Sequence, residues 1–175
     1  MVLTMDIPDL AATEAWGRRL GALLFPGAVI ALVGPLGAGK THLVRAIAEG
    51  MEVKNPTAVN SPTFLLIHEY PARLPIYHFD AYRLTAPREF AELGVEEYFR
   101  GEGVCLIEWA DKVASLLPAE RLWIDIQIVD TTRRRFTVTA TGPRYENLLT
   151  LLTATNPLPS HAAGEAPACP RLGPT

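Results

Sequence analysis

The sequence of 175 residues predicts an α/β fold in which a mixed sheet lies between two layers of helices. Apolar runs at 28–33 and 104–107 show no polar alternation, which is typical of parallel strands buried on both faces. Predicted strands alternate with helices at first and then give way to a hairpin. We therefore predict a single domain over residues 1–153, with a sheet that is parallel at its centre and antiparallel toward one edge.

The first predicted elements lead to a glycine-rich loop. Residues 1–8 predict an edge strand or a loose arm. Asp9 is a suitable N-cap for a helix over 10–24, because apolar side chains recur there at helical spacing and a Pro-Gly pair follows. The apolar strand over 28–33 comes next, and a helix is predicted from the loop to about Glu49.

The middle of the chain predicts a hairpin followed by a helix. Residues 51–60 carry no periodic pattern and are predicted to form a loop. Segments 64–70 and 76–80 are rich in aromatic and apolar residues and are joined by a short turn cluster, as in an antiparallel hairpin. Thr85 is predicted to cap a helix that ends near Leu93.

The last part of the domain predicts two strands and a closing helix, after the strand at 104–107 and a short helix at 112–117. Residues 122–128 alternate strictly between apolar and polar, so one face of that strand is predicted to be wetter. A returning strand near 136–140 and a helix over 144–152 complete the domain.

Composition excludes several classes of protein. The net charge of −3 argues against a large nucleic-acid footprint, which needs a broad basic face. No apolar run is long enough to span a membrane, and the two cysteines give no disulfide framework, so we expect a cytoplasmic protein. Residues 154–175 are rich in Pro, Ala and Gly, and this tail is predicted to be disordered.

The glycine-rich loop carries the strongest functional signal. Residues 34–41 read Gly-Pro-Leu-Gly-Ala-Gly-Lys-Thr and fit the spacing G-x-x-x-x-G-K-[ST] between a strand and a helix. In such a P-loop the backbone N–H groups converge on phosphate, Lys40 reaches the β and γ phosphates, and the Thr41 hydroxyl binds Mg²⁺. This context favours a nucleoside-triphosphate site in a P-loop NTPase sandwich over a glycine-rich turn without a ligand.

Further candidate residues lie at strand ends. Glu108 follows an apolar strand, where open α/β sheets place ligand-facing groups, so it is a candidate metal carboxylate or else a carboxylate that merely faces solvent. His78 and Asp80 point the same way along a strand, which suggests either a polar pair near the metal or a pair that holds a turn. Residues 133–135 are three arginines at a turn, a pattern more typical of a solvated turn than of an RNA or phosphate contact.

A tripeptide, Ser61-Pro62-Thr63, lies between the loop helix and the predicted hairpin. Nucleotide switches place a segment that senses the γ-phosphate at this point of the chain. The same tripeptide is equally consistent with a simple turn before a strand.

Four motifs in this order and spacing resemble the bacterial TsaE (formerly YjeE) family, the P-loop ATPase of tRNA threonylcarbamoyladenosine biosynthesis. They are the loop at 34–41, Asn-Ser-Pro-Thr-Phe at 60–64, His-Phe-Asp-Ala-Tyr-Arg-Leu at 78–84 and Leu-Ile-Glu-Trp at 106–109. The resemblance extends over about residues 10–142. One departure is Pro35, where the family usually has an acidic residue.

The resemblance implies a role for each matched residue. The implied nucleotide-binding residues are Thr13, Gly37, Ala38, Gly39, Lys40, Thr41, His42 and Arg134. Thr13, with the neighbouring Glu14, and Arg134 are implied to lie near the base. The other implied roles are Thr41 and Glu108 for Mg²⁺, Asp80 and Glu108 for catalysis, and Ser61, Pro62 and Thr63 for the first switch segment.

The function that this resemblance implies is Mg²⁺-dependent ATP binding and hydrolysis, in support of threonylcarbamoyl transfer to adenosine 37 of tRNA. The expected partner is a TsaB–TsaD-like protein complex, through which tRNA is reached only indirectly. Hydrolysis by the isolated chain is expected to be weak and raised by that complex. The alternatives are a P-loop small-molecule kinase and a nucleotide-gated binding module that does not require hydrolysis.

Overall fold

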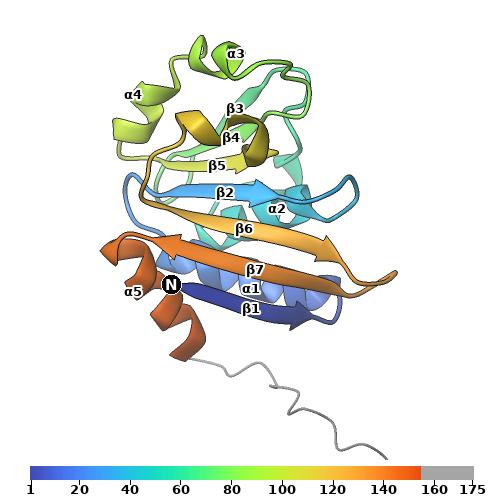
Figure 1. Ribbon diagram of the computed structural model, residues 1–175. Coiled ribbons are helices and arrows are strands. Elements are labelled where there is room, and N and C mark those ends of the chain that lie inside the picture. Colours follow the sequence, from blue (N-terminus) through green and yellow to red (C-terminus); the bar gives the residue numbers. More distant parts are fainter. Residues whose placement is uncertain (155–175) are drawn as a thin grey trace, which may run out of the picture.

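Seven strands form one mixed sheet in the computed structural model, which describes residues 1–154 (Figure 1). The strands are β1 (Val2–Ile7), β2 (Val29–Val33), β3 (Ile67–Tyr70), β4 (Ile76–Asp80), β5 (Val104–Glu108), β6 (Arg121–Ile128) and β7 (Arg134–Thr141). The helices are α1 (Leu10–Leu23), α2 (Lys40–Gly50), α3 (Pro87–Ala91), α4 (Val95–Arg100) and α5 (Pro143–Ala154), with 3₁₀ turns η1 (Pro56–Ala58) and η2 (Ala110–Leu116).

The sheet order is β1-β7-β6-β2-β5-β4-β3. The inner strands β6, β2, β5 and β4 pair in parallel, which confirms the predicted α/β fold with a mixed sheet. Antiparallel pairs occur at both edges rather than at one. At the second edge β7 returns antiparallel to β6, and the first residues of the chain add β1 outside it, as the predicted edge strand and not as a loose arm: Val2 to Ile7 lie opposite Thr139 to Arg134.

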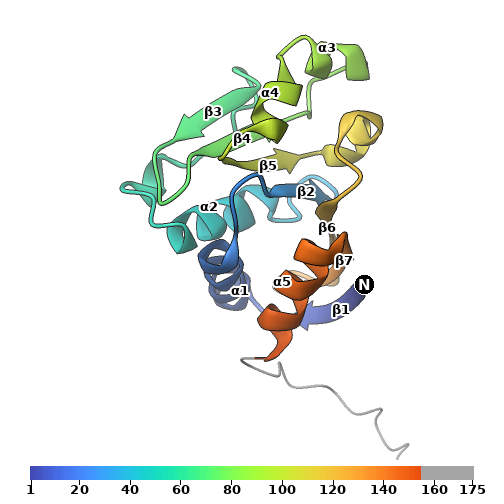
Figure 2. The same ribbon diagram turned by 90° about the vertical axis from the view of Figure 1, so that its left-hand side faces the viewer.

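Helices cover both faces of the sheet and make three layers. Figure 2 shows α1 and α2 on one side of the central strands, with α3 and α4 on the other. Side chains of the central strand β2 alternate between the two cores: Ile30 and Leu32 pack in the core that includes α1, α2 and α5, whereas Val29 and Ala31 pack in the core that includes α3, α4 and η2. All four are buried, which explains why this strand shows no polar alternation.

Two predicted elements differ from the structure. The strand predicted over 64–70 begins only at Ile67, because the Pro62 carbonyl accepts hydrogen bonds from the backbone N–H groups of Leu65 and Leu66 and closes a turn. The side chains of Phe64 and Leu65 are consequently exposed. The helix predicted from Thr85 to about Leu93 corresponds to α3, which has Ala86 rather than Thr85 at its N-cap and ends at Ala91; the separate short helix α4 begins after Gly94.

The predicted domain boundary lies at the end of α5, whose last residue is Ala154. The rest of the tail that was predicted to be disordered lies outside the described residues. Within residues 1–154, no helix is both long and apolar enough to cross a membrane.

Candidate functional site

The glycine-rich loop connects the carboxyl end of β2 to the start of α2. Gly34 packs against β6 so closely that a Cβ would lie 2.4 Å from the carbonyl oxygen of Ile126. Gly37 and Gly39 have φ angles of 77° and 105°, and a Cβ at either would meet no atom within 4 Å. Their open sides leave room for a ligand against the backbone. Because Gly39 caps α2 without a side-chain hydrogen bond and no acidic residue lies in the first turn, this helix end favours an anion.

Lys40 is folded back over the same loop. Its Nζ donates to the carbonyl oxygens of Gly34 at 2.7 Å and Pro35 at 3.0 Å, and lies 3.7 Å from the centroid of the Trp109 ring. The residue is only 5% exposed. Burial lowers the pKa of Lys40 from its usual value, while the negative charges of Glu108 and two other carboxylates act in the opposite direction. Within residues 1–154, the ammonium group hydrogen-bonds to these two carbonyl oxygens and forms no ion pair with a carboxylate.

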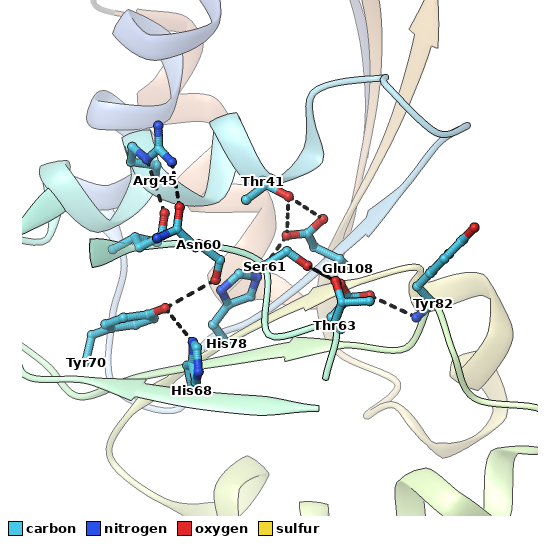
Figure 3. A network of polar contacts seen from close by, with 12 residues as sticks. Thr41, Arg45, Asn60, Ser61, Thr63, His68, Tyr70, His78, Tyr82 and Glu108 are labelled. Atoms are coloured by element: carbon cyan, nitrogen blue, oxygen red, sulfur yellow. Dashed lines mark hydrogen bonds and ion pairs between the residues drawn. The ribbon is translucent and has the colours of Figure 1, made fainter. Parts of the chain in front are cut away.

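Glu108, the last residue of β5, faces the first turn of α2. Thr41 Oγ1 lies 2.9 Å from its Oε1 and 3.0 Å from its Oε2, and His78 Nε2 lies 2.9 Å from Oε1 (Figure 3). The glutamate is 3% exposed. The structure thus brings together the two residues predicted for Mg²⁺, through the ends of a helix and of a parallel strand.

Asp80, the last residue of β4, lies beside Glu108 in the register of the parallel strands. Its Oδ2 accepts hydrogen bonds from Ser61 Oγ and from Thr63 Oγ1, the latter at 2.9 Å, and its Oδ1 accepts one from the backbone N–H of Tyr82 at 2.9 Å. The hydroxyls of Ser61 and Thr63 also contact each other at 2.6 Å. The predicted switch segment therefore packs directly against the predicted catalytic carboxylate.

The strand positions of His78 and Asp80 suggested that these two side chains form a pair, but they do not. Alternation does place both side chains on one face, but residues two apart along a strand are separated by about 7 Å. The imidazole instead reaches across to Glu108 on the neighbouring strand β5. The alternation of side chains along one strand predicted the sheet face of His78 correctly and its hydrogen-bond partner wrongly.

A second polar network holds the segment that precedes Ser61 (Figure 3). Arg45 of α2 donates from Nε to the Val59 carbonyl oxygen and from Nη2 to Asn60 Oδ1, both at 3.2 Å. Tyr70 of β3 donates to the Asn60 carbonyl oxygen at 3.3 Å, and His68 Nδ1 lies 3.0 Å from its hydroxyl. Asn60 belongs to the motif at 60–64, but sequence reasoning missed the contacts of Arg45, His68 and Tyr70, since these three residues belong to none of the four motifs.

A cavity of about 400 Å³ opens beside the glycine-rich loop. Its lining residues are Asp9, Leu10, Thr13, Gly37, Ala38, Gly39, His42, Thr131, Thr132 and Arg134. Six of these belong to the predicted nucleotide-binding set. Asp9, Leu10, Thr131 and Thr132 were missed as site residues, although the N-cap position of Asp9 already placed it at the start of α1. Glu14 is not among the lining residues, and its carboxylate lies 3.8 Å from Arg18 Nη1.

Arg134 connects the glycine-rich loop to the turn between β6 and β7, both of which line this cavity. Its Nε donates to the Ala38 carbonyl oxygen at 3.0 Å, and its Nη1 donates to the carbonyl oxygens of Asp130 at 3.0 Å and Arg133 at 2.9 Å. The other two arginines of the run form exposed ion pairs, Arg133 with Asp130 and Arg135 with Asp6. Hydrogen bonds from the backbone and side chain of Arg133 lower the pKa of Asp130 to about 2.

These features define a class of protein. A three-layer α/β sandwich with a G-x-x-x-x-G-K-T loop between a central parallel strand and a helix, and with carboxylates at the ends of two neighbouring strands, belongs to the P-loop class. The chain matches the family described as threonylcarbamoyl adenosine biosynthesis protein TsaE over residues 7–136. It belongs to the TsaE family.

Individual relatives agree with that assignment. The chain is 46% identical over 137 residues to the tRNA threonylcarbamoyladenosine biosynthesis protein TsaE of Bacillus subtilis, covering 78% of this chain and 84% of that protein. It is 40% identical over 126 residues to the protein of the same name from Treponema pallidum, covering 72% and 92% of the two chains. The crystal structure of Bacillus subtilis YdiB superposes with a TM-score of 0.73 at 38% identity, covering 87% of this chain and 95% of that one.

Proposed function

We propose that this chain binds and hydrolyses ATP with Mg²⁺, and that it supports threonylcarbamoyl transfer to adenosine 37 of tRNA through a partner complex. The observation that carries the proposal is the convergence of Lys40, Thr41, Glu108 and Asp80 beside the open face of the glycine-rich loop. Membership of the TsaE family supplies the biological context.

The cavity and the loop together suit a nucleotide. The open sides of Gly37 and Gly39 suit the phosphates, because backbone N–H groups there can approach an anion without a side chain between them. Lys40 would leave the carbonyl groups of Gly34 and Pro35 for the β and γ phosphates. The cavity between Thr13, His42 and Arg134 is of the size that small ligands occupy, and it would hold the base and ribose.

The donors at Glu108 suit Mg²⁺. The Thr41 hydroxyl and the Glu108 carboxylate are hard oxygen ligands within 3.0 Å of each other. Magnesium in nucleotide sites is bound through one or two such protein groups together with phosphate oxygens and water. When bound, the ion would neutralise charge on the phosphates. Thr41 and Glu108 would hold it, and Asp80 on the neighbouring strand would accept a proton from the attacking water.

Slow hydrolysis by the isolated chain is part of the proposal. Asp80 is engaged by the hydroxyls of Ser61 and Thr63 and must be released before it can act on water. Arg134 and Arg45, which hydrogen-bond beside the loop and the switch segment, are directed at backbone carbonyls and Asn60. A TsaB–TsaD-like complex that reorders the switch segment and supplies a stabilising cation would raise the rate by about 10³–10⁵.

Contact with tRNA is proposed to be indirect. The net charge of −3 and the ion pairs that engage Arg133 and Arg135 give little basis for a phosphate-backbone footprint. The exposed neighbours Phe64 and Leu65, directly after the switch segment, suit contact with a protein instead. We place this activity in the cytoplasm.

The test is phosphate release from Mg·ATP by the purified chain, alone and with the TsaB–TsaD-like complex, beside a search for any phosphorylated small molecule. We expect weak basal release, strong stimulation by the complex and no phosphorylated acceptor. A phosphorylated acceptor would indicate a kinase. Partner binding that depends on ATP while no phosphate is released would indicate a nucleotide-gated binding module.

A further inference from the structure

One buried side chain beside the proposed metal site has no role in the function argued so far. His78 is fully buried in β4, on the sheet face that packs against α2. Its Nε2 lies 2.9 Å from Glu108 Oε1. Its Nδ1 has no hydrogen-bond partner, and it is the one buried side-chain nitrogen or oxygen in residues 1–154 of which this is true.

These two observations assign the tautomer of the ring. A carboxylate only accepts hydrogen bonds, so the nitrogen that faces Glu108 carries the proton. At Nδ1 a bare lone pair is less costly than an N–H group buried without an acceptor. The ring therefore donates a hydrogen bond from Nε2 to Glu108.

Space filling alone does not account for an imidazole at this position. An apolar side chain of similar size would fill the core without leaving a polar nitrogen unpaired. The cost is offset by the bond to Glu108, whose Oε1 is thereby held by two donors, His78 and Thr41. Both donors belong to regular elements, a strand and a helix, so the carboxylate has little freedom to rotate.

We propose that His78 is a positioning residue for the metal site. Its Nε2–H fixes the Glu108 carboxylate in the orientation in which both oxygens lie within 3.0 Å of the Thr41 hydroxyl. Hydrogen bonds to a metal ligand from a second residue orient that ligand, and their loss typically lowers metal affinity about 10- to 100-fold. The proposal rests on the proposed function in one respect, namely that Glu108 faces Mg²⁺.

The test compares three variants of the full chain: His78→Gln, His78→Asn and His78→Leu. A glutamine amide reaches about as far as Nε2 and keeps a donor, whereas asparagine is one methylene shorter and leucine has none. For each variant we would measure the affinity for ATP with Mg²⁺ and with EDTA, and take the ratio. This ratio is insensitive to the fraction of folded protein, so a general loss of stability does not change it.

We expect the ratio to fall about tenfold or more in His78→Leu and His78→Asn and to stay within about threefold of wild type in His78→Gln. A ratio within about threefold of wild type in His78→Leu would overturn the proposal. An equal fall in His78→Gln and His78→Leu would also overturn it, since ring packing rather than the donor would then be responsible.

A double-mutant cycle with Glu108→Gln provides an independent check. If His78 acts through Glu108, then His78→Leu should lower the ratio by no more than about twofold further in the Glu108→Gln background. Additive losses would reject the coupling. Wild-type protein whose ATP affinity does not respond to Mg²⁺ would instead remove the metal from the proposed function, an outcome distinct from a wild-type response that His78 variants leave unchanged.

Discussion

Two carboxylates lie side by side at the ends of neighbouring parallel strands, and they are held in opposite ways. Glu108 and Asp80 are register partners and are equally buried, each with 3% of the residue exposed. Glu108 accepts hydrogen bonds from Thr41 and His78, which belong to a helix and a strand. Asp80 accepts side-chain hydrogen bonds from Ser61 and Thr63, which lie in an irregular segment.

Under the proposed function, this difference in support would separate the binding of Mg·ATP from its hydrolysis. Groups on packed helices and strands keep their positions. The site around Glu108 therefore suits the binding of Mg·ATP, which must be complete before hydrolysis. Groups on loops can exchange partners at lower cost, so the Asp80 end suits a step that is switched. Variants at the two ends should therefore fail in different assays.

The largest effect is expected at Lys40, on the binding side of the comparison. Lys40→Ala removes charge-assisted contacts to phosphate worth about 1.5–3 kcal/mol each, so two such contacts imply a loss of ATP affinity of about 10²–10⁴-fold. Calorimetric titration with Mg·ATP checks this. The far-ultraviolet circular dichroism spectrum should stay unchanged. ATP binding within about threefold of wild type would remove the P-loop interpretation.

The next effect separates the two carboxylates directly. Asp80→Ala and Glu108→Ala should each lower the partner-stimulated ATPase rate by about 10²-fold or more, since a proton acceptor alone contributes about 10²–10⁴. Asp80→Ala should leave ATP affinity within about threefold of wild type, whereas Glu108→Ala should weaken Mg²⁺-dependent binding.

Asp80→Asn and Glu108→Gln are the matched controls, because they keep the shape of each side chain and remove its charge. The proposed difference between Glu108 and Asp80 is contradicted if Asp80→Ala leaves the partner-stimulated ATPase rate unchanged. It is also contradicted if Asp80→Ala and Glu108→Ala weaken ATP binding to the same extent.

A smaller effect follows from the pKa of Lys40, which burial lowers. Phosphate charge beside the ammonium should raise that pKa again, so ATP binding takes up a proton at any pH between the free and bound values. ATP affinity should accordingly fall as pH rises through the lowered pKa, by at most about tenfold per pH unit. Calorimetry in two buffers of different ionisation enthalpy measures the uptake, and Lys54→Arg, an exposed lysine elsewhere, should leave it unchanged.

The two ends also differ in how far the sequence predicts them. The glycine-rich loop is local: eight consecutive residues specify its backbone, its helix start and the positions of Lys40 and Thr41. The position of Glu108 follows from the rule that parallel strands present ligand-facing groups at their carboxyl ends. The cavity residues Thr131 and Thr132 could not be predicted in this way. They lie in the turn between β6 and β7, and only the order of strands in the sheet places that turn beside the loop.

Contacts that depend on pairing across the sheet or on loop shape escaped prediction. The partner of His78 is decided by which strand lies next to β4, and the pattern within one strand does not contain that information. The apolar residues Phe64 and Leu65 resemble the start of a strand in composition, yet the turn closed by the Pro62 carbonyl exposes them. The hydrogen bonds from the switch hydroxyls to Asp80 span 17 and 19 residues and depend on that turn.

The smallest predicted effect tests whether those hydroxyls hold Asp80 in the free protein. Thr63→Ala removes one donor from a buried carboxylate that still accepts from Ser61 and from the Tyr82 N–H, so we expect unfolding free energy to fall by about 1–2 kcal/mol. In a chain of this size that corresponds to a melting temperature lower by about 2–8 °C. Thr63→Ser keeps the hydroxyl and should stay close to wild type, and ATP affinity should remain within about threefold in both variants. If Thr63→Ala has the same melting temperature as wild type, the hydrogen bond from Thr63 does not stabilise Asp80. Both carboxylates would then be held by the helices and strands around them.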